Sequence, residues 1–428
     1  MSMDAYIEEV KRRLGGEAEE YIAALSERPK KGLHLNPVKA AGIDISSLGF
    51  VVKKLPYGEG CYEVLGGSPT AHPYYRAGLY YMQEPTAMLP VSYADIPGGA
   101  KVLDMCAAPG GKSSMAASRL RGSGLLVSND ADRSRAETLR ENIVASGYAN
   151  VLVTNMRAEK LPEAFGCAFD VVIVDAPCSG EGMMRKEPQA ALDWSRKNVE
   201  TCAERQKRIL LAADGCLKEG GLLVYSTCTF SEEEDEDNAR FMLARGYEEE
   251  ALSDPYLAAA RREIGYKFYP HRYPGEGQYF CLLRKRSSGG GEARHKKLAR
   301  AGKSDLAKLA EVMDVSGVEI VRVGNMLVSP ALDADMPCLM NGVLIASEER
   351  DGRLTFSHQA ATAFGDRFRE REDIPLGDDR IAAYLRGEEI SGSARGVCAV
   401  CAGGHALGIG KGVGGVIKNK YPKNLRTR

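Results

Sequence analysis

The sequence has no run approaching the roughly 18 apolar residues that a membrane-spanning helix needs, so we expect no membrane partner. Its first residues, MSMDAYIEEVKRRL, include acids and have no apolar stretch before a cleavage site, which argues against a secretory signal. Eleven cysteines at irregular spacings then predict reduced thiols and a cytoplasmic protein rather than a disulfide framework. The net charge of -1 decides neither for nor against nucleic acid.

Histidine and tryptophan are scarce, with six and one in 428 residues, and the histidines show no metal-ligand spacing. The pair Cys398 and Cys401, with His405 close by, is the one metal-like motif. Structural zinc sites usually have four ligands, so we expect no metal. A chain of this length predicts roughly two to four domains.

Positive charge gathers in two segments. Residues 284–303 carry eight Lys/Arg and one acid around a Ser-Gly-rich centre, which is typical of a flexible linker. Residues 410–428 carry six Lys/Arg and no acid. Either run alone is typical of a solvated surface, but two around one C-terminal module favour a polyanion partner. The acidic run 232–237 is interpreted as structural, because Ser231 and Glu234 have capping-box spacing at a helix start.

Strand-like and helix-like segments alternate between about residues 98 and 285. The expected strands are mostly apolar: 101–106, 125–130, 151–155, 171–175 and 221–228. Apolar strands alternating with helices predict an α/β fold with a parallel sheet covered on both faces. In such sheets ligands bind beyond the carboxyl ends of the strands.

The first of these strands leads into CAAPGGKSS, residues 106–114. A P-loop would need glycine at position 106, where Cys106 stands, and GxGxxG is also missing. A glycine turn before a helix still lets a ligand approach backbone amides. Asp130, at the end of the next strand, could accept the ribose hydroxyls of a nucleoside. Together they predict a nucleoside cofactor without pyrophosphate, S-adenosylmethionine.

Two cysteines stand where strands end. Cys178 follows Asp175 in DAPCSGEG, and Cys228 ends GLLVYSTC. If these strands are neighbours, roughly 4.8 Å apart, both thiols emerge at one edge of the sheet. Free cysteine is otherwise a small buried hydrophobe, the interpretation given to six others: Cys61, Cys167, Cys202, Cys216, Cys281 and Cys338.

Four motifs carry a resemblance to a known family: LDMCAAPGGKSS, DAPCSGEGMMRKEP, YSTCTFSEEEDEDN and the terminal KNKYPKNLR. The chain resembles the Nol–Nop–Sun family of RNA cytosine-C5 methyltransferases, and within it the bacterial RsmF type, which modifies small-subunit ribosomal RNA. HLNPVKA and GLYYMQEPTAMLP look like the family's N-terminal domain, and PHRYPGEGQYF like its last core hairpin. The resemblance implies a Rossmann-like class I methyltransferase core and a PUA-like terminal module.

The resemblance implies a role for each motif. Cys228 would be the nucleophile that adds to cytosine carbon 6, Cys178 would assist release, and Asp175 would face the amide edge of the base and the cofactor. Lys112 could orient Asp175 or the base. The other implied cofactor residues are Cys106, Ala107, Ala108, Pro109, Gly110, Gly111, Lys112, Asp130 and Arg135. Where the family has an acid near the adenine, this chain has 155–159 without a carboxylate at the expected position, so backbone groups or Asn155 could serve.

RNA contacts are also implied. Arg185 and Lys186 would face RNA, whereas Trp194 is interpreted mainly as packing under a loop. In the tail, the expected contacts are Lys418, Lys420 and Lys423. The target base would leave its stack to reach Cys228.

The expected organisation is an N-terminal α/β domain over 1–95, the methyltransferase core over 96–286, a basic linker over 287–304 and an α+β RNA-binding region over 305–428. We expect a monomer that acts on small-subunit ribosomal RNA or its precursor. Three alternatives stay open: a transfer-RNA cytosine-5 methyltransferase, a DNA cytosine methyltransferase, and a catalytically silent RNA-binding assembly factor. The STCT cysteine and the basic terminal module argue against the DNA enzyme, and the presence of both cysteines argues against the silent factor.

Overall fold

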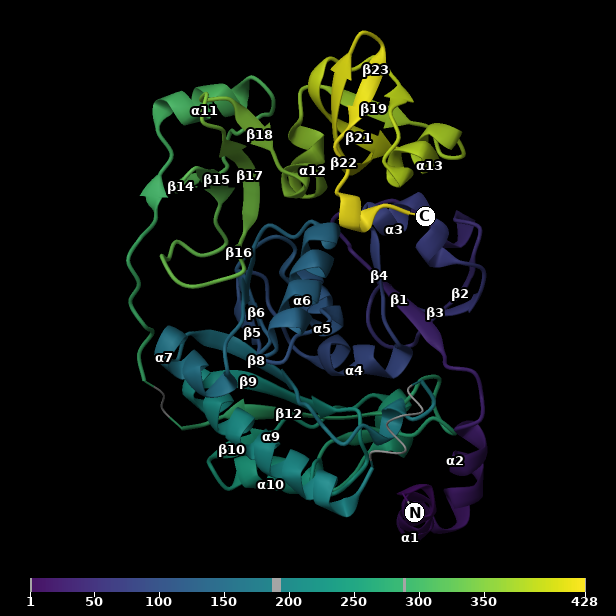
Figure 1. Ribbon diagram of the computed structural model, residues 1–428. Helices are drawn as coiled ribbons and strands as arrows, with labels where there is room; N and C mark the ends of the chain where they lie inside the picture. Colours follow the sequence, from purple (N-terminus) through teal and green to yellow (C-terminus); the bar gives the residue numbers. More distant parts are fainter. Residues whose placement is uncertain (1, 187–193, 288–289, 428) are drawn as a thin grey trace.

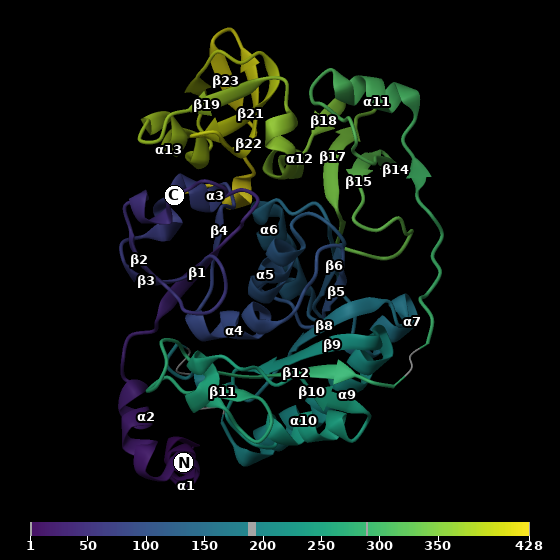
Figure 2. The same ribbon diagram turned by 180° about the vertical axis from the view of Figure 1, so that it is seen from behind.

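The computed structural model describes residues 2–186, 194–287 and 290–427. The N-terminal part begins with three helical segments: α1 (Ser2–Leu14), η1 (Gly15–Glu17) and α2 (Ala18–Ala24). An antiparallel sheet in the order β2-β3-β1-β4 follows. Its strands are β1 (Lys31–Leu35), β2 (Val51–Lys54), β3 (Cys61–Gly66) and β4 (Tyr80–Met82), with α3 (Pro73–Arg76) beside them. Figures 1 and 2 show the two helices below this sheet, beside the lower half of the core.

The central sheet has the order β10-β12-β9-β8-β5-β6-β7-β16, and β11 pairs with β12. Five strands run parallel: β5 (Lys101–Asp104), β6 (Leu125–Asn129), β7 (Val151–Thr154), β8 (Phe169–Asp175) and β9 (Leu217–Thr227). Antiparallel strands complete it: β10 (Tyr247–Glu249), β11 (Tyr266–Phe268), β12 (Gln278–Lys285) and β16 (Met340–Asn341). The expected alternating α/β core is confirmed, with each predicted strand within a few residues of its place.

Helices cover both faces of this sheet because alternate strand residues point to opposite sides. On β8, Val171 and Ile173 belong to one apolar cluster, and Val172 and Val174 to the other. The first face is covered by α4 (Pro85–Tyr93), α5 (Gly111–Leu120) and α6 (Arg133–Ser146). The second face is covered by α7 (Leu161–Phe165), α9 (Arg196–Cys216) and α10 (Glu236–Leu243).

The C-terminal region contains two five-stranded sheets (Figure 1). The first includes β13 (Ala299–Arg300), β14 (Val321–Val323), β15 (Met326–Ser329), β17 (Val343–Glu348) and β18 (Leu354–Phe356), beside α11 (Lys303–Ala310). The last includes β19 (Arg371–Ile374), β20 (Ile390–Ser391), β21 (Gly396–Ala402), β22 (His405–Val413) and β23 (Val416–Asn419), with α13 (Asp379–Arg386). Between them lies α12 (His358–Phe364). The α+β expectation for this region is confirmed.

The C-terminal modules pack on each other and on the rest of the molecule. Met313 of the first and Ile409 of the last lie in one apolar cluster, and Leu33 of β1 shares another with Ile417 of β23. The N-terminal sheet therefore packs directly against the last module.

The remaining short helices are 3-10 turns: η2 (Ile45–Ser47), η3 (Pro69–Ala71), η4 (Ala158–Lys160), η5 (Glu181–Met183), η6 (Pro255–Ala260), η7 (Gly365–Arg367) and η8 (Lys423–Leu425).

The flexible linker expected over 284–303 is instead bonded to the rest of the protein in its described part. Residues 290–293 run along the core: Cys167 N–H donates to the Gly291 carbonyl at 3.2 Å, and Ala293 N–H donates to the Phe165 carbonyl at 2.9 Å. Residues 296–300 bond to the C-terminal region, where the Lys296 carbonyl accepts from Asp335 N–H at 2.8 Å and β13 pairs with β14. Further on, β16 adds to the edge of the core sheet against β7. Backbone pairing with a distant loop cannot be read from a Ser-Gly-rich composition, because glycine bonds through its main chain as well as any residue does.

Candidate functional site

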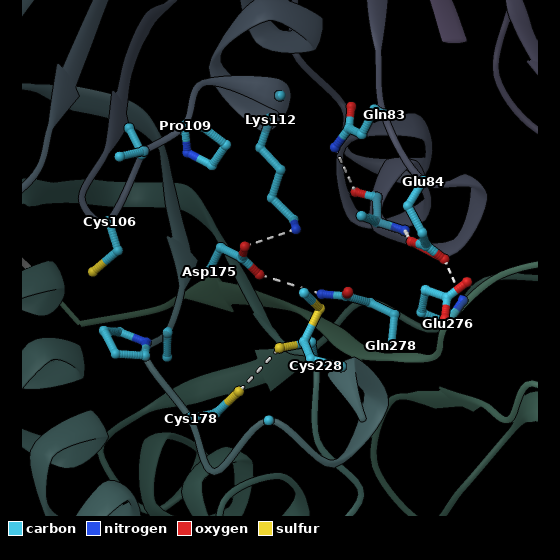
Figure 3. Close-up of a pocket in the computed structure, with 18 of the residues that line it drawn as sticks. Gln83, Glu84, Cys106, Pro109, Lys112, Asp175, Cys178, Cys228, Glu276 and Gln278 are labelled. Atoms are coloured by element: carbon cyan, nitrogen blue, oxygen red, sulfur yellow. Dashed lines mark hydrogen bonds and ion pairs between the residues drawn. The ribbon is translucent and has the colours of Figure 1, made fainter. Parts of the chain in front are cut away.

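A pocket of 840 Å³ opens where β5, β8 and β9 end. Its walls come from the β5–α5 turn, the turn after Asp175, Cys228 and the β11–β12 hairpin. The segment Tyr81–Glu84 closes it from the N-terminal side. Figure 3 shows these side chains converging from segments far apart in sequence. The carboxyl edge of a parallel sheet is where this architecture places its ligands.

The two expected thiols meet in this pocket. Cys178 Sγ and Cys228 Sγ lie 3.3 Å apart (Figure 3), because β8 and β9 are parallel neighbours with Asp175 opposite Ser226. The prediction that both thiols emerge at one edge is confirmed. The hydrogen bond with Cys228, together with burial, raises the pKa of Cys178 well above its usual value. Cys178 is therefore held as a neutral thiol beside the other sulfur.

Asp175 is held by three side chains. Lys112 Nζ lies 2.8 Å from Asp175 Oδ2, and Ser226 Oγ donates to Asp175 Oδ1 at 2.7 Å. Gln278 Nε2 also donates to Oδ1, at 3.2 Å. This ion pair places Lys112 where it can orient Asp175, one of the two roles that the sequence left open for this lysine. Gln278 was missed because it lies a hundred residues away on β12, which reaches the site only by pairing with β9.

The turn between β5 and α5 has the close backbone approach expected of a ligand cradle. A Cβ on Gly111 would lie 2.8 Å from the Gln83 side chain, and Gly110 has a φ of 116°. Ala108 N–H donates to Asp130 Oδ2 at 3.3 Å, while Arg135 donates to the Ala108 carbonyl at 2.9 Å. The expected cofactor residues that line the pocket are Cys106, Ala107, Ala108, Pro109, Gly111, Lys112, Arg135 and Asp175. Asp130 and Gly110 do not line the pocket; Asp130 supports the turn from outside through its bond with Ala108.

Asp104, the last residue of β5, was not singled out from the sequence. It is buried and lines the pocket; Ser113 Oγ donates to its Oδ2 at 2.8 Å, whereas its Oδ1 has no partner among the described residues. An unpaired buried acceptor is costly unless a ligand donor reaches it. A cationic amino group fits this place, as the methionine part of S-adenosylmethionine would supply. The available signal was an acid directly before the glycine turn.

Burial raises the pKa of Asp104 to about 7. An acid whose pKa is raised on folding costs stability as pH climbs from its ordinary value to the raised one, and the full cost remains above it. Asp104→Asn is therefore expected to stabilise the ligand-free protein by about 1–4 kcal/mol at pH 8 and by less than half as much at pH 5. Denaturant unfolding at both pH values measures this, with the exposed Asp95→Asn as control. An equal effect at both pH values would contradict it.

Residues 155–159, where the resemblance implied an acid near the adenine, do not line the pocket. The side-chain nitrogen of Asn155 donates hydrogen bonds to the Asp130 and Ala131 carbonyls, at 2.8 and 3.1 Å. Arg157 is exposed. Asn155 thus shapes the strand exit through its amide nitrogen, which leaves its side-chain oxygen and the backbone as groups for a base.

Arg185 does not face solvent, contrary to the expectation of an RNA contact. Its side chain is 2% exposed and pairs with Glu276 at 2.8 Å, and its guanidinium also donates to the Ala24 and Gly275 carbonyls. Lys186, one residue on, is exposed and lines the pocket. The sequence could not show that Arg185 is buried and Lys186 exposed, because the partners of Arg185 lie about ninety and a hundred and sixty residues away along the chain.

Trp194 packs inside the protein, as its interpretation as a packing residue predicted. Its ring meets Tyr6 edge-on with centroids 5.3 Å apart, and its Nε1–H donates to Glu181 at 3.1 Å. Arg13 of α1 pairs with the same Glu181 at 2.5 Å. The N-terminal helices therefore cover the segment that follows the DAPCSGEG turn.

The tail lysines are exposed, as expected: Lys418, Lys420 and Lys423. The neighbouring cysteines cannot share a metal, because Cys398 and Cys401 point to opposite faces of β21, into different apolar clusters. Within 2–186, 194–287 and 290–427, no group of three His, Cys, Asp or Glu could hold a metal ion. Of the six cysteines expected to be buried, Cys338 is exposed and Cys167 half-buried. In the same described ranges, no helix is long and apolar enough to cross a membrane.

Comparison with known proteins gives matches over most of the chain. The model of 16S rRNA methyltransferase RsmB/F matches residues 95–284. The N-terminal domain of 16S rRNA methyltransferase RsmF matches residues 3–85, and the methyltransferase RsmF PUA domain matches residues 371–427. The last match falls on the module built from β19 to β23.

Whole-length relatives and a solved structure agree with these matches. The ribosomal RNA small subunit methyltransferase F of Vibrio vulnificus (strain YJ016) is 31% identical over 82% of this chain and 80% of its own. That of Psychromonas ingrahamii is 27% identical over 95% and 93%. NSun6 from Pyrococcus horikoshii, solved with SFG, shares the fold with a TM-score of 0.58, 22% identity, and coverage of 66% and 98%. The chain therefore belongs to the RsmF family of 16S rRNA methyltransferases and is an S-adenosylmethionine-dependent methyltransferase with a C-terminal PUA domain.

Proposed function

We propose that this protein methylates carbon 5 of a cytidine in 16S ribosomal RNA through a covalent bond between Cys228 and the base. The observation that carries the proposal is the pair of thiols 3.3 Å apart in the pocket that also contains Asp175 and the glycine turn. The relatives' names support the RNA class, and the solved neighbour bound to SFG, an S-adenosylmethionine analogue, supports the cofactor.

Carbon 5 of cytosine is a poor nucleophile, and the first task of the site is to activate it. A Cys228 thiolate adds to carbon 6, which leaves carbon 5 with enamine character. S-adenosylmethionine supplies an electrophilic methyl group when bound. Asp175, oriented by Lys112 and Ser226, faces the amide edge of the ring. As the carboxylic acid it donates its proton to nitrogen 3 while the sulfur adds, so the electron density pushed into the ring is neutralised there.

Release requires carbon 5 to lose its proton and the carbon–sulfur bond to break. The bonding electrons then return to the sulfur of Cys228. Cys178, kept as a thiol by its raised pKa, donates a hydrogen bond to that sulfur from 3.3 Å and stabilises it as a leaving group. This assigns attack to Cys228 and assistance in release to Cys178.

The test is methyl transfer with purified components, followed by mapping in cells. We expect labelled methyl to pass from S-adenosylmethionine to 16S ribosomal RNA, and bisulfite sequencing to find cytidines that are protected in wild-type cells and converted in cells lacking the gene. Transfer RNA and free, precursor or subunit-assembled ribosomal RNA are compared in the same assay. Loss of protection only in transfer RNA would refute the ribosomal substrate, and no loss anywhere would refute the reaction.

RNA binding away from the pocket is proposed for a second hollow of 760 Å³ between the two C-terminal modules. Arg350, Lys411 and Lys420 line it and are exposed, and none has an ion-pair partner in the described part of the chain. Positive side chains that converge from both modules suit an RNA backbone. Lys418 and Lys423 lie outside this hollow, so their proposed RNA contacts are separate.

Replacing Arg350, Lys411 and Lys420 together by alanine is expected to weaken RNA binding and to lower the slope of log affinity against log salt by about 2–3. The reason is that each lost phosphate contact releases roughly one counterion fewer. Filter binding from low to moderate salt measures the slope, with exposed Lys160→Ala and Lys197→Ala as controls. An unchanged slope would place the RNA elsewhere.

A further inference from the structure

We propose that Glu234 is a positioning residue that holds the turns of Cys178 and Cys228 together and so sets the separation of the two thiols. Its side chain is buried, and it lies six residues after Cys228 in the acidic run that the sequence suggested was a helix start. The helix α10 begins only at Glu236. Glu234 therefore precedes the helix, and its contacts are made elsewhere.

The Glu234 carboxylate accepts four hydrogen bonds from three residues. Ser179 donates both its backbone N–H, at 3.0 Å, and its hydroxyl, at 2.5 Å. Gln206 donates at 2.8 Å, and Ser231 at 3.0 Å. An ionised carboxylate only accepts, so four donors aimed at one side chain match it and would be partly unpaired around any other.

These bonds fix the backbone on both sides of Cys178. Ser179, which follows it, is held by Glu234 through two atoms. Pro177, which precedes it, has its carbonyl bonded at 3.1 Å by the same Gln206 amide group that bonds Glu234. The backbone on each side of Cys178 is thus bonded to Glu234, directly at Ser179 and through Gln206 at Pro177.

The Cys228 turn is joined to the same network. Thr229 Oγ1 lies 2.8 Å from Ser179 Oγ, and Cys228 itself accepts at its carbonyl from the Gly182 N–H at 2.8 Å. The Glu234 backbone carbonyl accepts from the hydroxyl of Tyr225 at 2.5 Å, which ties the residue back to β9. One carboxylate therefore links the strand end that carries Cys228 to the turn that carries Cys178.

The pairing of β8 and β9 ends at Asp175 and Ser226, and past it two backbone bonds join the turns, from Ala176 N–H to the Ser226 carbonyl and from Gly182 N–H to the Cys228 carbonyl. Neither bond holds the backbone next to Cys178, which depends on Glu234. A shift of about 1 Å between the turns would take the sulfurs out of hydrogen-bonding reach, and small misplacements cost much activity. In the proposed reaction, on which this inference rests, the step most affected is release. Glu234→Ala removes both acceptor oxygens, so we expect the turns to separate.

Phenylarsine oxide tests the separation without any RNA. It condenses with two adjacent thiols to give a cyclic dithioarsenite and one water, so tight binding reports thiols that are close together. We expect the wild-type protein to bind phenylarsine oxide tightly, and we expect Cys178→Ser to lose this tight binding. Glu234→Ala should bind it about tenfold more weakly, and the matched Glu233→Ala, at a half-buried position with no buried contacts, should bind as wild type.

Methyl transfer and adduct formation are measured on the same variants. Glu234→Ala should accumulate a denaturation-resistant protein–RNA adduct, with S-adenosylmethionine affinity unchanged; a general loss of structure would lower both. Wild-type arsenical affinity in Glu234→Ala would overturn the inference, whatever its activity. Weakened arsenical binding with wild-type methyl transfer would keep the positioning role and refute the two-thiol reaction.

A milder variant covers the case in which Glu234→Ala does not fold, as judged by circular dichroism. Ser179→Ala removes the hydroxyl that joins Glu234 to Thr229 and keeps the backbone bond. It should weaken arsenical binding by about threefold, because one of four bonds to the carboxylate is lost. Unchanged affinity in a folded Ser179→Ala protein would also overturn the inference.

Discussion

Cys228→Ala is expected to lower methyl transfer by about 10³-fold or more, because it removes the sulfur that the proposed route bonds to carbon 6, and the neighbouring Cys178 has its pKa raised and stays a neutral thiol. The side chain stands at the end of β9 in the wall of the pocket, beside the oriented Asp175. Alanine removes the sulfur without adding volume, and the turn is held by the backbone and by Thr229. Single-turnover transfer to 16S ribosomal RNA measures the loss.

Two controls make this result specific to attack. Cys338→Ala, at an exposed thiol outside the pocket, should transfer methyl as wild type. Cofactor affinity in Cys228→Ala should stay within about twofold, because the glycine turn and Asp104 are untouched. Wild-type turnover in Cys228→Ala would refute the covalent route, and lost turnover with lost cofactor affinity would indicate damage to the pocket instead.

Cys178→Ala is expected to trap the covalent intermediate. The sulfur of Cys228 then has no hydrogen-bond donor at 3.3 Å when it leaves carbon 6, so the adduct should break down about 10²-fold or more slowly while attack still occurs. Denaturing gel electrophoresis with labelled RNA should show a shifted protein–RNA band that accumulates with time.

The double variant Cys178→Ala with Cys228→Ala is the control for this band and should form none. The opposite pattern is equally informative. An adduct in Cys228→Ala, formed through Cys178, would exchange the two assignments and give the order of attack that the DNA cytosine enzymes use. A Cys178→Ala protein that turns over at the wild-type rate without an adduct would show that release needs no second thiol.

Local patterns predicted the core of the fold well. Period and composition located β5 to β9 because a strand buried on both faces needs an apolar run, whatever its neighbours are. The same patterns placed Cys178 and Cys228 at strand ends, and parallel pairing then brought the ends together. The cysteines could be found in this way because each lies next to its own strand.

Local patterns failed where a charge had a distant partner. Arg185 and Lys186 are neighbours of the same kind, yet one is buried against Glu276 and the other is exposed on the pocket rim. The acidic run does contain a helix start, since α10 begins at Glu236 with acids in its first turn, but its spacing gave no sign that Glu234 also bonds across to Ser179 and Gln206. A Coulombic or hydrogen-bonded partner far along the chain leaves no periodic trace in the sequence.

The sequence by itself determined the alternating core, the glycine turn and the position of Cys178 and Cys228 at strand ends, since these follow from residue type and position along single strands. Only the tertiary structure decided that Lys112 forms an ion pair with Asp175, that Gln278 and Asp104 line the pocket, and that residues 290–293 follow the core. The physical reason is the separation along the chain over which each kind of interaction acts. Burial and strand propensity act on neighbours in sequence, whereas hydrogen bonds and ion pairs act between groups that only folding brings within 3 Å.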